Sequence, residues 1–409
     1  MPARRRPRGR NENRARPSFR ATARRPGRAI GQGRIDRSMV MVDWLIVGAG
    51  FVGAVAAEHL ARVHGQTVLV IDRRDHVAGN AHDARNEDGI LHHRYGPHIF
   101  HTNAPRIADY LSGFTEWRDY EHRAVALIEN RLVPIPFNFT SLDIVFPAGK
   151  AARIKQRMIE RYGFGANTTI LALRSEQDGL LRECADYVYE YVFLGYTSKQ
   201  WGLRPDEIDA SVTNRVPVRV SYDDRYFQDS FQKMPRAGYT RMFERMLASR
   251  LIEVSLATEW RDVRDRVRYK NVLFTGAIDE FFDYRLGVLP YRSLEFEMQV
   301  YDQPLHQPVA QVNYPNGERF TRITEMKHLT GESGPRTMAA IEYPIPHRPG
   351  ETVPYYPIPR ADNEALHREY VLLNRAKTVH FAGRLADYRY YNMDQAVGRA
   401  ISLVSKLRG

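Results

Sequence analysis

The chain has 409 residues, a length at which two or three domains are expected, and its 43% hydrophobic content is typical of a globular protein. Its apolar runs fall short of the roughly 18 residues that cross a bilayer, so no membrane span is predicted. Cys184 is the only cysteine, which excludes an intrachain disulfide and a thiolate metal cluster and fits a reducing cytoplasm.

The positive charge is concentrated in residues 1–38. This tail has 13 Arg against two acids, a net charge of +11, whereas the whole chain carries +12. The rest of the chain is therefore close to neutral, and the Arg-, Pro- and Gly-rich tail is predicted to be disordered. The tail could be functional, as a transit peptide or as a segment that binds nucleic acid or acidic surfaces. Alternatively, it is an uncleaved or mis-assigned upstream extension, because Met39 and Met41 directly precede the first strand. An upstream extension is the favoured interpretation. Nucleic acid is then expected to contact only the tail, and only non-specifically.

A dinucleotide-binding unit is predicted at residues 42–72. An apolar run ending at Val47 reads as a buried strand, a helical stretch follows, and a second apolar run ends in Asp72. The turn fits G-x-G-x-x-G with Gly48, Gly50, Phe51, Val52 and Gly53. The glycines permit a tight turn close to a pyrophosphate, the helix N-terminus attracts it, and the acid is placed for an adenosine ribose. This order of parts favours dinucleotide binding over a purely structural turn.

The next stretch is predicted to be a polar loop over the edge of the cofactor. Arg73 and Arg74 offer an alternative clamp for an NADP 2′-phosphate, but an acid at Asp72 makes that the weaker choice. Four histidines then fall within ten positions: His92, His93, His98 and His101. Arginine, glycine and proline interrupt this run, so no metal is predicted, and a loop that packs imidazoles against a planar ring is favoured over zinc.

Hydrophobic periodicity predicts the remaining helices and strands. Helices are expected at 105–112 and 149–195, short strands at 123–139, and a strand-like segment from Val212 to Phe231. A buried strand at 271–276 is expected to rejoin the first sheet. Antiparallel strands are expected at 291–301 and 308–314, a strand at 377–385, and a final helix from Met393 to Leu407.

The predicted fold class is α/β with α+β insertions. It comprises an FAD-binding Rossmann-type domain (39–105, about 236–285 and 375–409), a helical domain with a mobile loop (about 105–115 and 145–205) and an antiparallel sheet domain (about 116–144, 206–235 and 286–374).

Arginines and aromatic residues recur in the strand-like segments. The arginines are Arg215, Arg219, Arg292, Arg322 and Arg384, and the aromatic residues are Tyr196, Trp201, Tyr226, Tyr356 and Tyr390. Singly, each is explained as well by an ordinary ion pair or by core packing. Together, in a near-neutral domain, they suggest a cleft for an anionic, ring-bearing ligand such as a nucleotide-sugar diphosphate.

Several long blocks then resemble the bacterial UDP-galactopyranose mutases from about residue 42 to the C-terminus: HHRYGPHIFHTN, GYTSKQWG, NRVPVR, YRSLEFE, PYYP and FAGRLADYRYYNMDQ. The resemblance implies a flavoenzyme that interconverts UDP-galactopyranose and UDP-galactofuranose through an adduct between the sugar and N5 of reduced FAD, with no net redox change. It also implies supply of galactofuranose for cell-surface glycans, and a homodimer. The alternative is an FAD-dependent oxidoreductase of the amine-oxidase type, which an apolar cleft would favour.

By the same resemblance, Arg215 and Arg322 match arginines for the substrate diphosphate, and His98 matches the histidine nearest the flavin and the sugar. Further substrate positions are Tyr196, Thr197, Trp201, Tyr226, Asn313, Tyr356, Tyr390 and Asn392. Flavin-side positions, besides the glycine turn, are Asp72, Arg73, Asn80, His101, Arg292, Arg384 and Met393. Three residues depart from the family pattern, with Ala78 in place of Gly, Asp72 in place of Glu and Asn392 in place of Asp.

Overall fold

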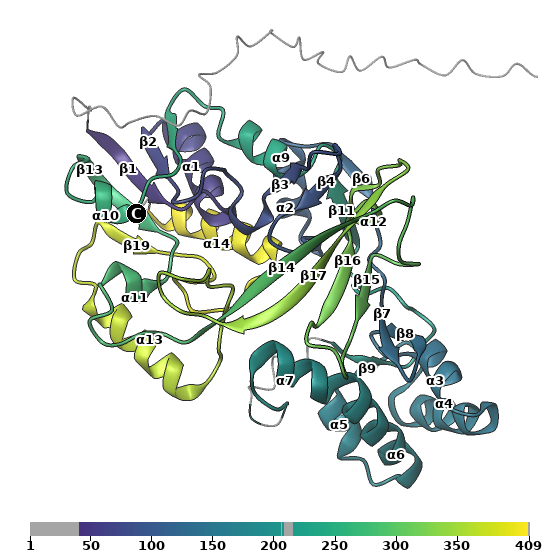
Figure 1. Cartoon of the computed structure of the whole chain (residues 1–409). Coiled ribbons are helices and arrows are strands. Elements are labelled where there is room, and N and C mark those ends of the chain that lie inside the picture. Colours follow the sequence, from purple (N-terminus) through teal and green to yellow (C-terminus); the bar gives the residue numbers. More distant parts are fainter. Residues whose placement is uncertain (1–40, 206, 208–215, 408–409) are drawn as a thin grey trace, which may run out of the picture.

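The computed structural model describes residues 41–205, 207 and 216–407 (Figure 1). The tail of residues 1–38 and the predicted site residue Arg215 lie outside this range.

A parallel five-stranded sheet contains the predicted dinucleotide-binding unit. Its order is β12 (Ile252–Ser255), β2 (Val68–Ile71), β1 (Val42–Val47), β13 (Tyr269–Phe274) and β19 (Val379–Phe381). Residues on one face, such as Ile46 and Val70, pack under α1 (Phe51–His64) and α14 (Met393–Lys406), while Leu45 and Leu69 face α10 (Trp260–Val263). Burial on both faces explains the nearly continuous apolar runs. The strand at 271–276 rejoins this sheet beside β1, as predicted.

The second large sheet has seven strands and crosses the centre of the molecule (Figure 1). Its order is β18 (Tyr356–Pro357), β14 (Tyr291–Tyr301), β17 (Thr337–Pro346), β16 (Arg322–Glu325), β15 (Gln311–Asn313), β7 (Ala124–Ile128) and β8 (Arg131–Ile135). All neighbours are antiparallel except β15 and β7.

Helices from residue 139 to residue 201 form a separate layer with a hydrophobic core of their own (lower right in Figure 1). Asn138 and Asp178 cap two of these helices by accepting main-chain N–H bonds, which satisfies donors that a helix start leaves unpaired. The layer comprises α3 (Phe139–Val145), α4 (Ala148–Tyr162), α5 (Ile170–Arg174), α6 (Gly179–Val188), a π-helical turn at Tyr189–Leu194 and α7 (Gly195–Trp201).

Shorter elements connect these layers. The strands are β3 (Asp83–Arg85), β4 (Leu91–His93), β5 (Phe100–Thr102), β6 (Trp117–Asp119), β9 (Asn167–Thr168), β10 (Val218–Arg219) and β11 (Phe231–Pro235). The helices are a 3₁₀ turn at Gly79–Ala81, α2 (Pro105–Ser112), α9 (Tyr239–Met246), α11 (Ile278–Phe281), α12 (Met326–Thr330) and α13 (Ala361–Leu373).

The predicted α/β class is confirmed, but one predicted strand is wrong. Of the stretch from Val212 to Phe231, the described part pairs as a strand only at Val218–Arg219 before β11 begins at Phe231. An alternation of Arg with Tyr is not the alternation of polar with apolar residues that a half-buried strand requires. The division into three domains stays a prediction.

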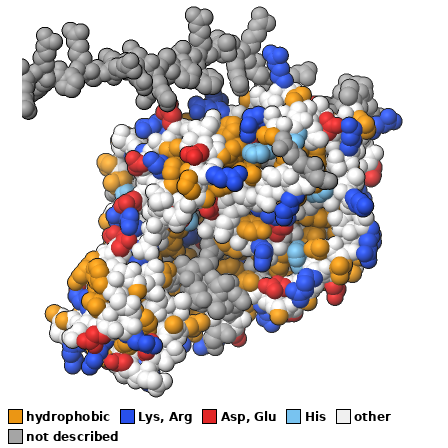
Figure 2. Space-filling view, turned by 180° about the vertical axis from the view of Figure 1, so that it is seen from behind, with side chains coloured by type: hydrophobic (Ala, Val, Ile, Leu, Met, Phe, Trp, Pro, Cys, Tyr) orange, Lys and Arg blue, Asp and Glu red, His pale blue; other side chains and the backbone are white. Residues whose placement is uncertain are grey.

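Two surface properties follow the sequence analysis. Within residues 41–205, 207 and 216–407, no helix combines the length and apolar character needed to cross a membrane. On the face seen in Figure 2, basic and acidic side chains are interspersed, as expected for a near-neutral body.

Candidate active site

The glycine turn is shaped by two close approaches. Gly48 has φ +109°, and a Cβ on it would lie 2.0 Å from Oγ1 of Thr275. A Cβ on Gly53 would lie 1.9 Å from the carbonyl oxygen of Gly48, so only glycine lets α1 start this close to β1. Gly50 differs, because its nearest neighbour at the Cβ position is the Cα of Gly79 at 3.9 Å.

Asp72 follows the last residue of β2 and lies next to the glycine turn. It is 9% exposed and accepts hydrogen bonds from the main-chain N–H groups of Ala49 (2.8 Å) and Arg74 (2.9 Å). These bonds hold the turn against the end of β2.

The two arginines after Asp72 have partners within the protein. Arg73 forms an ion pair with Glu280 at 2.5 Å, whereas Arg74 lies over the Tyr95 ring at 4.1 Å and donates to Oδ1 of Asn80 at 2.8 Å. With these partners engaged, the pair does not form the open cationic clamp that a 2′-phosphate requires.

A cavity of about 510 Å³ opens in front of the turn. The predicted residues that line it are Gly48, Gly50, Phe51, Val52, Asp72, Arg73, Asn80, His98, Arg384, Asn392 and Met393. Gly53 lies beneath the turn, and neither His101 nor Arg292 is among the lining residues.

The first turn of α14 forms one wall of this cavity. Asn392 is its N-cap and takes part in a capping box with Gln395, and Met393 and Ala396 also line the cavity. A helix N-terminus carries unpaired N–H groups and a partial positive charge, which suits an anionic or electron-rich group.

His98 faces the cavity as a neutral imidazole. Desolvation lowers its pKa to about 3, with smaller contributions from nearby cations that include Arg384 and Arg322. Its Nδ1 lies 2.9 Å from the carbonyl oxygen of Gly96. In the neutral ring Nδ1 therefore donates to this carbonyl, and Nε2 is left as an acceptor.

The other histidines of the run make different contacts and do not form a single site. His93 is buried, and its Nδ1 accepts the main-chain N–H of His98 at 3.1 Å. His101 stacks on Phe227 with ring centroids 3.6 Å apart and lies 2.9 Å from Oδ2 of Asp229. In the described ranges, no group of three or more His, Cys, Asp or Glu residues is arranged to hold a metal ion.

A second cluster adjoins the cavity through Arg384. Its guanidinium lies 4.7 Å from the ring of Tyr390 and 5.4 Å from that of Tyr356, and it donates to the carbonyl oxygen of Tyr391 at 2.7 Å. The rings of Tyr356 and Tyr390 are stacked, and Trp201 lies 6.0 Å from Tyr356. Arg384 therefore belongs both to the cavity wall and to the predicted substrate cluster.

Arg322 has an acidic partner that sequence reasoning missed. Its Nε and Nη2 donate to Oε2 of Glu342 at 2.9 and 2.7 Å, and Glu342 is 1% exposed. Burial alone would lower the pKa of Arg322, but the carboxylate more than offsets this and raises it well above the usual value. The two residues are direct cross-strand partners on β16 and β17. The signal was a lone acid directly after the apolar run at 338–341, although only the strand register reveals its partner.

The remaining predicted substrate residues surround Arg322. Asn313 lies opposite it on β15 and accepts a bond from Nε2 of Gln311 at 2.8 Å. Tyr196, in α7, has its pKa raised by burial, and the charge of Arg322 opposes that shift. Thr197 is buried in the same helix. Sequence reasoning also missed His122, a buried histidine near Arg322 whose pKa desolvation lowers to about 3.

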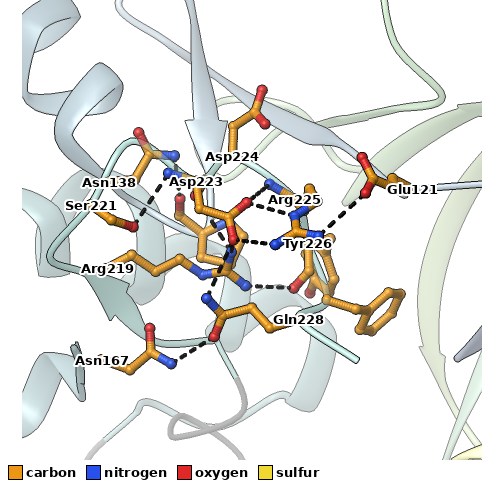
Figure 3. A network of polar contacts seen from close by, with 12 residues as sticks. Glu121, Asn138, Asn167, Arg219, Ser221, Asp223, Asp224, Arg225, Tyr226 and Gln228 are labelled. Atoms are coloured by element: carbon orange, nitrogen blue, oxygen red, sulfur yellow. Dashed lines mark hydrogen bonds and ion pairs between the residues drawn. The ribbon is translucent and has the colours of Figure 1, made fainter. Parts of the chain in front are cut away.

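The segment that carries Tyr226 is folded by charge pairs instead of strand pairing (Figure 3). Arg225 binds Asp223 through Nε and Nη2, both at 2.9 Å, and reaches Glu121 at 3.2 Å. Arg219 is 2% exposed and donates to the carbonyl oxygens of Asp223 and Tyr226. Arg219 is therefore a structural residue of this turn.

Arg292 does not itself line the cavity. Its Nε donates to the carbonyl oxygen of Gln200 at 2.9 Å and its Nη2 to that of Lys199 at 3.2 Å. These carbonyls are in the last turn of α7, where a helix leaves them without intrahelical partners. Arg292 therefore holds the C-terminal end of α7 against β14.

Comparisons with known proteins identify the family. Residues 191–390 match the family model of UDP-galactopyranose mutase, and residues 46–114 match that of an NAD(P)-binding Rossmann-like domain. A Klebsiella pneumoniae protein named "Probable UDP-galactopyranose mutase" is 37% identical over 87% of this chain and 92% of its own length. The dTDP-fucopyranose mutase of Escherichia coli is 33% identical over 87% of this chain and 96% of its own.

A crystal structure of reduced UDP-galactopyranose mutase superposes with a TM-score of 0.66 at 15% identity, covering 91% of this chain and 94% of that one, which supports the fold. The chain belongs to the UDP-galactopyranose mutase family.

Proposed function

We propose that this enzyme interconverts UDP-galactopyranose and UDP-galactofuranose with reduced FAD and without net redox change, supplying galactofuranose for cell-surface glycans. The observation that carries the proposal is the shared wall formed by Arg384, which lines the dinucleotide cavity and lies over Tyr356 and Tyr390. A cofactor ring at that wall would meet a sugar diphosphate held by the cluster. The polar, cationic character of the cluster favours this mutase over an amine-oxidase-type oxidoreductase.

The residues of the cavity fit FAD. The Cβ position of Gly50 is open to 3.9 Å, which leaves room for a pyrophosphate against the backbone. The N-terminus of α14 supplies N–H groups and partial positive charge for an electron-rich flavin ring. When bound and reduced, the flavin would supply the nucleophile, its N5, to the anomeric carbon of the sugar.

The protein's own part is to bind the diphosphate and to keep its polar groups in fixed protonation states. Glu342 occupies Nε and Nη2 of Arg322, so the Nη1 edge of the guanidinium would meet a diphosphate oxygen. Burial, followed by Tyr390 and Glu342, raises the pKa of Tyr356 to about 12, which keeps its hydroxyl a hydrogen-bond donor at neutral pH. His98 stays neutral and adds no competing charge.

The test is turnover of UDP-galactofuranose by purified protein with its flavin oxidised and then reduced by dithionite. Conversion only in the reduced state is expected. Because a curated relative is a dTDP-fucopyranose mutase, the dTDP-fucose pair is assayed in parallel. Conversion of that pair alone would keep the mutase chemistry but overturn the UDP-galactose assignment, and no conversion of either pair would overturn the proposal.

Arg322→Ala tests the cluster. Loss of a charge-assisted bond worth about 1.5–3 kcal/mol predicts turnover lower by about 10- to 150-fold with flavin still bound. Breaking a buried ion pair also leaves Glu342 unpaired, at a cost of about 3–5 kcal/mol in stability. The double variant Arg322→Ala/Glu342→Gln removes that charge, and Arg336→Ala is an exposed control. Normal turnover by the folded double variant would remove Arg322 from the site.

A further inference from the structure

Lys199 of α7 is held by main-chain carbonyls. Its ammonium donates to the carbonyl oxygens of Asn316 (3.1 Å), Glu318 (3.0 Å) and Phe320 (3.1 Å), and also to that of Tyr314. All four belong to the loop that joins β15 to β16. We call this set of four oxygens the carbonyl cage.

A cage of this kind is a cation site whose cation is part of the chain. Carbonyl oxygens can replace the hydration shell of a monovalent cation, and here they do so for an ammonium that has three N–H donors. Desolvation lowers the pKa of Lys199 to about 8, and the charge of Glu318 opposes the shift. The partial charges of the four carbonyls offset part of the cost of removing the ammonium from water.

Other contacts show that α7 and this loop are packed as one unit. A Cβ on Gly195, the first residue of α7, would lie 2.1 Å from the carbonyl oxygen of Pro315. Nδ2 of Asn316 donates to the carbonyl oxygen of Tyr191, in the π-helical turn that precedes α7. The loop therefore follows the chain from the π-helical turn into α7, and Lys199 lies one turn further along the helix.

The two elements that Lys199 joins carry different parts of the proposed substrate site. α7 carries Tyr196 and Trp201, while Asn313 ends β15 and Arg322 begins β16 on either side of the loop. Asn313 and Arg322 are cross-strand partners at the two ends of this loop, so a shift of the loop against α7 would act on both residues.

We infer that Lys199 is a positioning residue whose ammonium, seated in the carbonyl cage, holds Tyr196 and Trp201 of α7 in register with Arg322. The inference rests on the proposed function, since it concerns binding of the same nucleotide sugar. Removing the ammonium takes away the hydrogen bonds that join the last turn of α7 to the loop, and it leaves four carbonyl oxygens arranged for another cation.

The experiment combines Lys199→Ala with chemical rescue in the full chain with flavin bound. We expect the Kd for UDP and the KM for the nucleotide sugar to rise about 10- to 100-fold, with a smaller change in kcat. Propylammonium, which replaces the deleted part of the side chain, restores UDP binding, and neutral propanol does not. Lys150→Ala is the matched control, because Lys150 forms an ordinary ion pair with Glu183 in the same helical layer.

The outcomes separate this inference from the proposed function. Wild-type protein that neither binds UDP nor converts its sugars overturns the proposed function. Active wild-type protein with unchanged UDP affinity in Lys199→Ala overturns the role of Lys199. Lys199→Met keeps the length of the side chain without its charge. A lower melting temperature together with flavin loss in both variants would overturn the inference by showing that Lys199 serves folding. Failure of propylammonium to restore UDP binding to Lys199→Ala would overturn the positioning role of the ammonium.

Discussion

Replacing Gly53 with alanine should destabilise the protein itself. A Cβ at this position lies 1.9 Å from the carbonyl oxygen of Gly48 and 3.1 Å from Cγ2 of Ile46. Carbon and oxygen normally approach no closer than about 3.3 Å, so α1 and β1 must separate by roughly 1.4 Å. Gly48 has little freedom to move, because its N–H is bonded to the carbonyl oxygen of Ile71 at 2.8 Å.

Two opposing effects set the magnitude. Overpacking at a fixed backbone contact costs about 3 kcal/mol, the upper part of the usual range. Alanine inside a helix is better than glycine by about 1 kcal/mol, since it loses less backbone entropy on folding. We therefore expect Gly53→Ala to lower the free energy of unfolding by about 2 kcal/mol, whether or not a cofactor is bound.

Urea unfolding of the flavin-free protein, followed by far-ultraviolet circular dichroism, measures this loss. Gly50→Ala is the matched control, because Gly50 has an extended backbone that alanine adopts and no neighbour within 3.9 Å. Its stability should change by less than about 0.5 kcal/mol, while its methyl group hinders the approach of a pyrophosphate and lowers flavin retention. Unchanged stability in Gly53→Ala, or full flavin retention in Gly50→Ala, would refute this division of roles.

Two other substitutions test the backbone and the buried charge. Ala78→Gly should raise the free energy of unfolding by about 0.5–1 kcal/mol in urea titrations, because Ala78 has φ +74°, where a Cβ is strained; a loss of stability would contradict this. Burial raises the pKa of Asp279 to about 6, so the folded state loses up to about 3 kcal/mol as the pH rises from 4 to 6. Asp279→Asn should therefore stabilise the protein at pH 8 but not at pH 4, and equal effects at both pH values would show that Asp279 does not titrate this way.

The dinucleotide unit was predictable because its signals are local. An apolar run, fixed glycine spacing and a terminal acid lie within 31 residues, and each has a direct steric or electrostatic cause. The β14 strand was predicted with its observed ends, Tyr291 and Tyr301, because its flanks carry proline and glycine turns. The parallel partner of β1 was also placed correctly, since a buried run ending in glycine suits the same sheet.

The partners of the charged residues were not predictable from the sequence. They depend on how the strands pair in register and on which helix ends, distant in sequence, fold next to each charge. Glu342 meets Arg322 only once β16 and β17 are paired in one register. The contacts of Arg292 with carbonyls at the end of α7, some 90 residues earlier, could not be read from the sequence, and its place beside a flavin stays a prediction. The predicted strand continues past Arg219 and Arg225, but Asp223, which pairs with both arginines, folds the chain into a turn after β10.

This pairing decides how much positive charge the site offers a diphosphate. The arginines counted from sequence give a strongly cationic cleft, but Glu342 neutralises Arg322, and Arg292 is directed to carbonyls. In the described part of the chain, Arg384 has a main-chain carbonyl and two aromatic rings as partners, so its charge is not compensated by a carboxylate. Arg384 also lines the cavity in front of the glycine turn, so a cation without a carboxylate partner lies where the proposed cofactor and the substrate diphosphate would meet. Under the proposed function, the ion pair with Glu342 orients Arg322, and the charge of Arg384 would lie at the reacting end of the substrate.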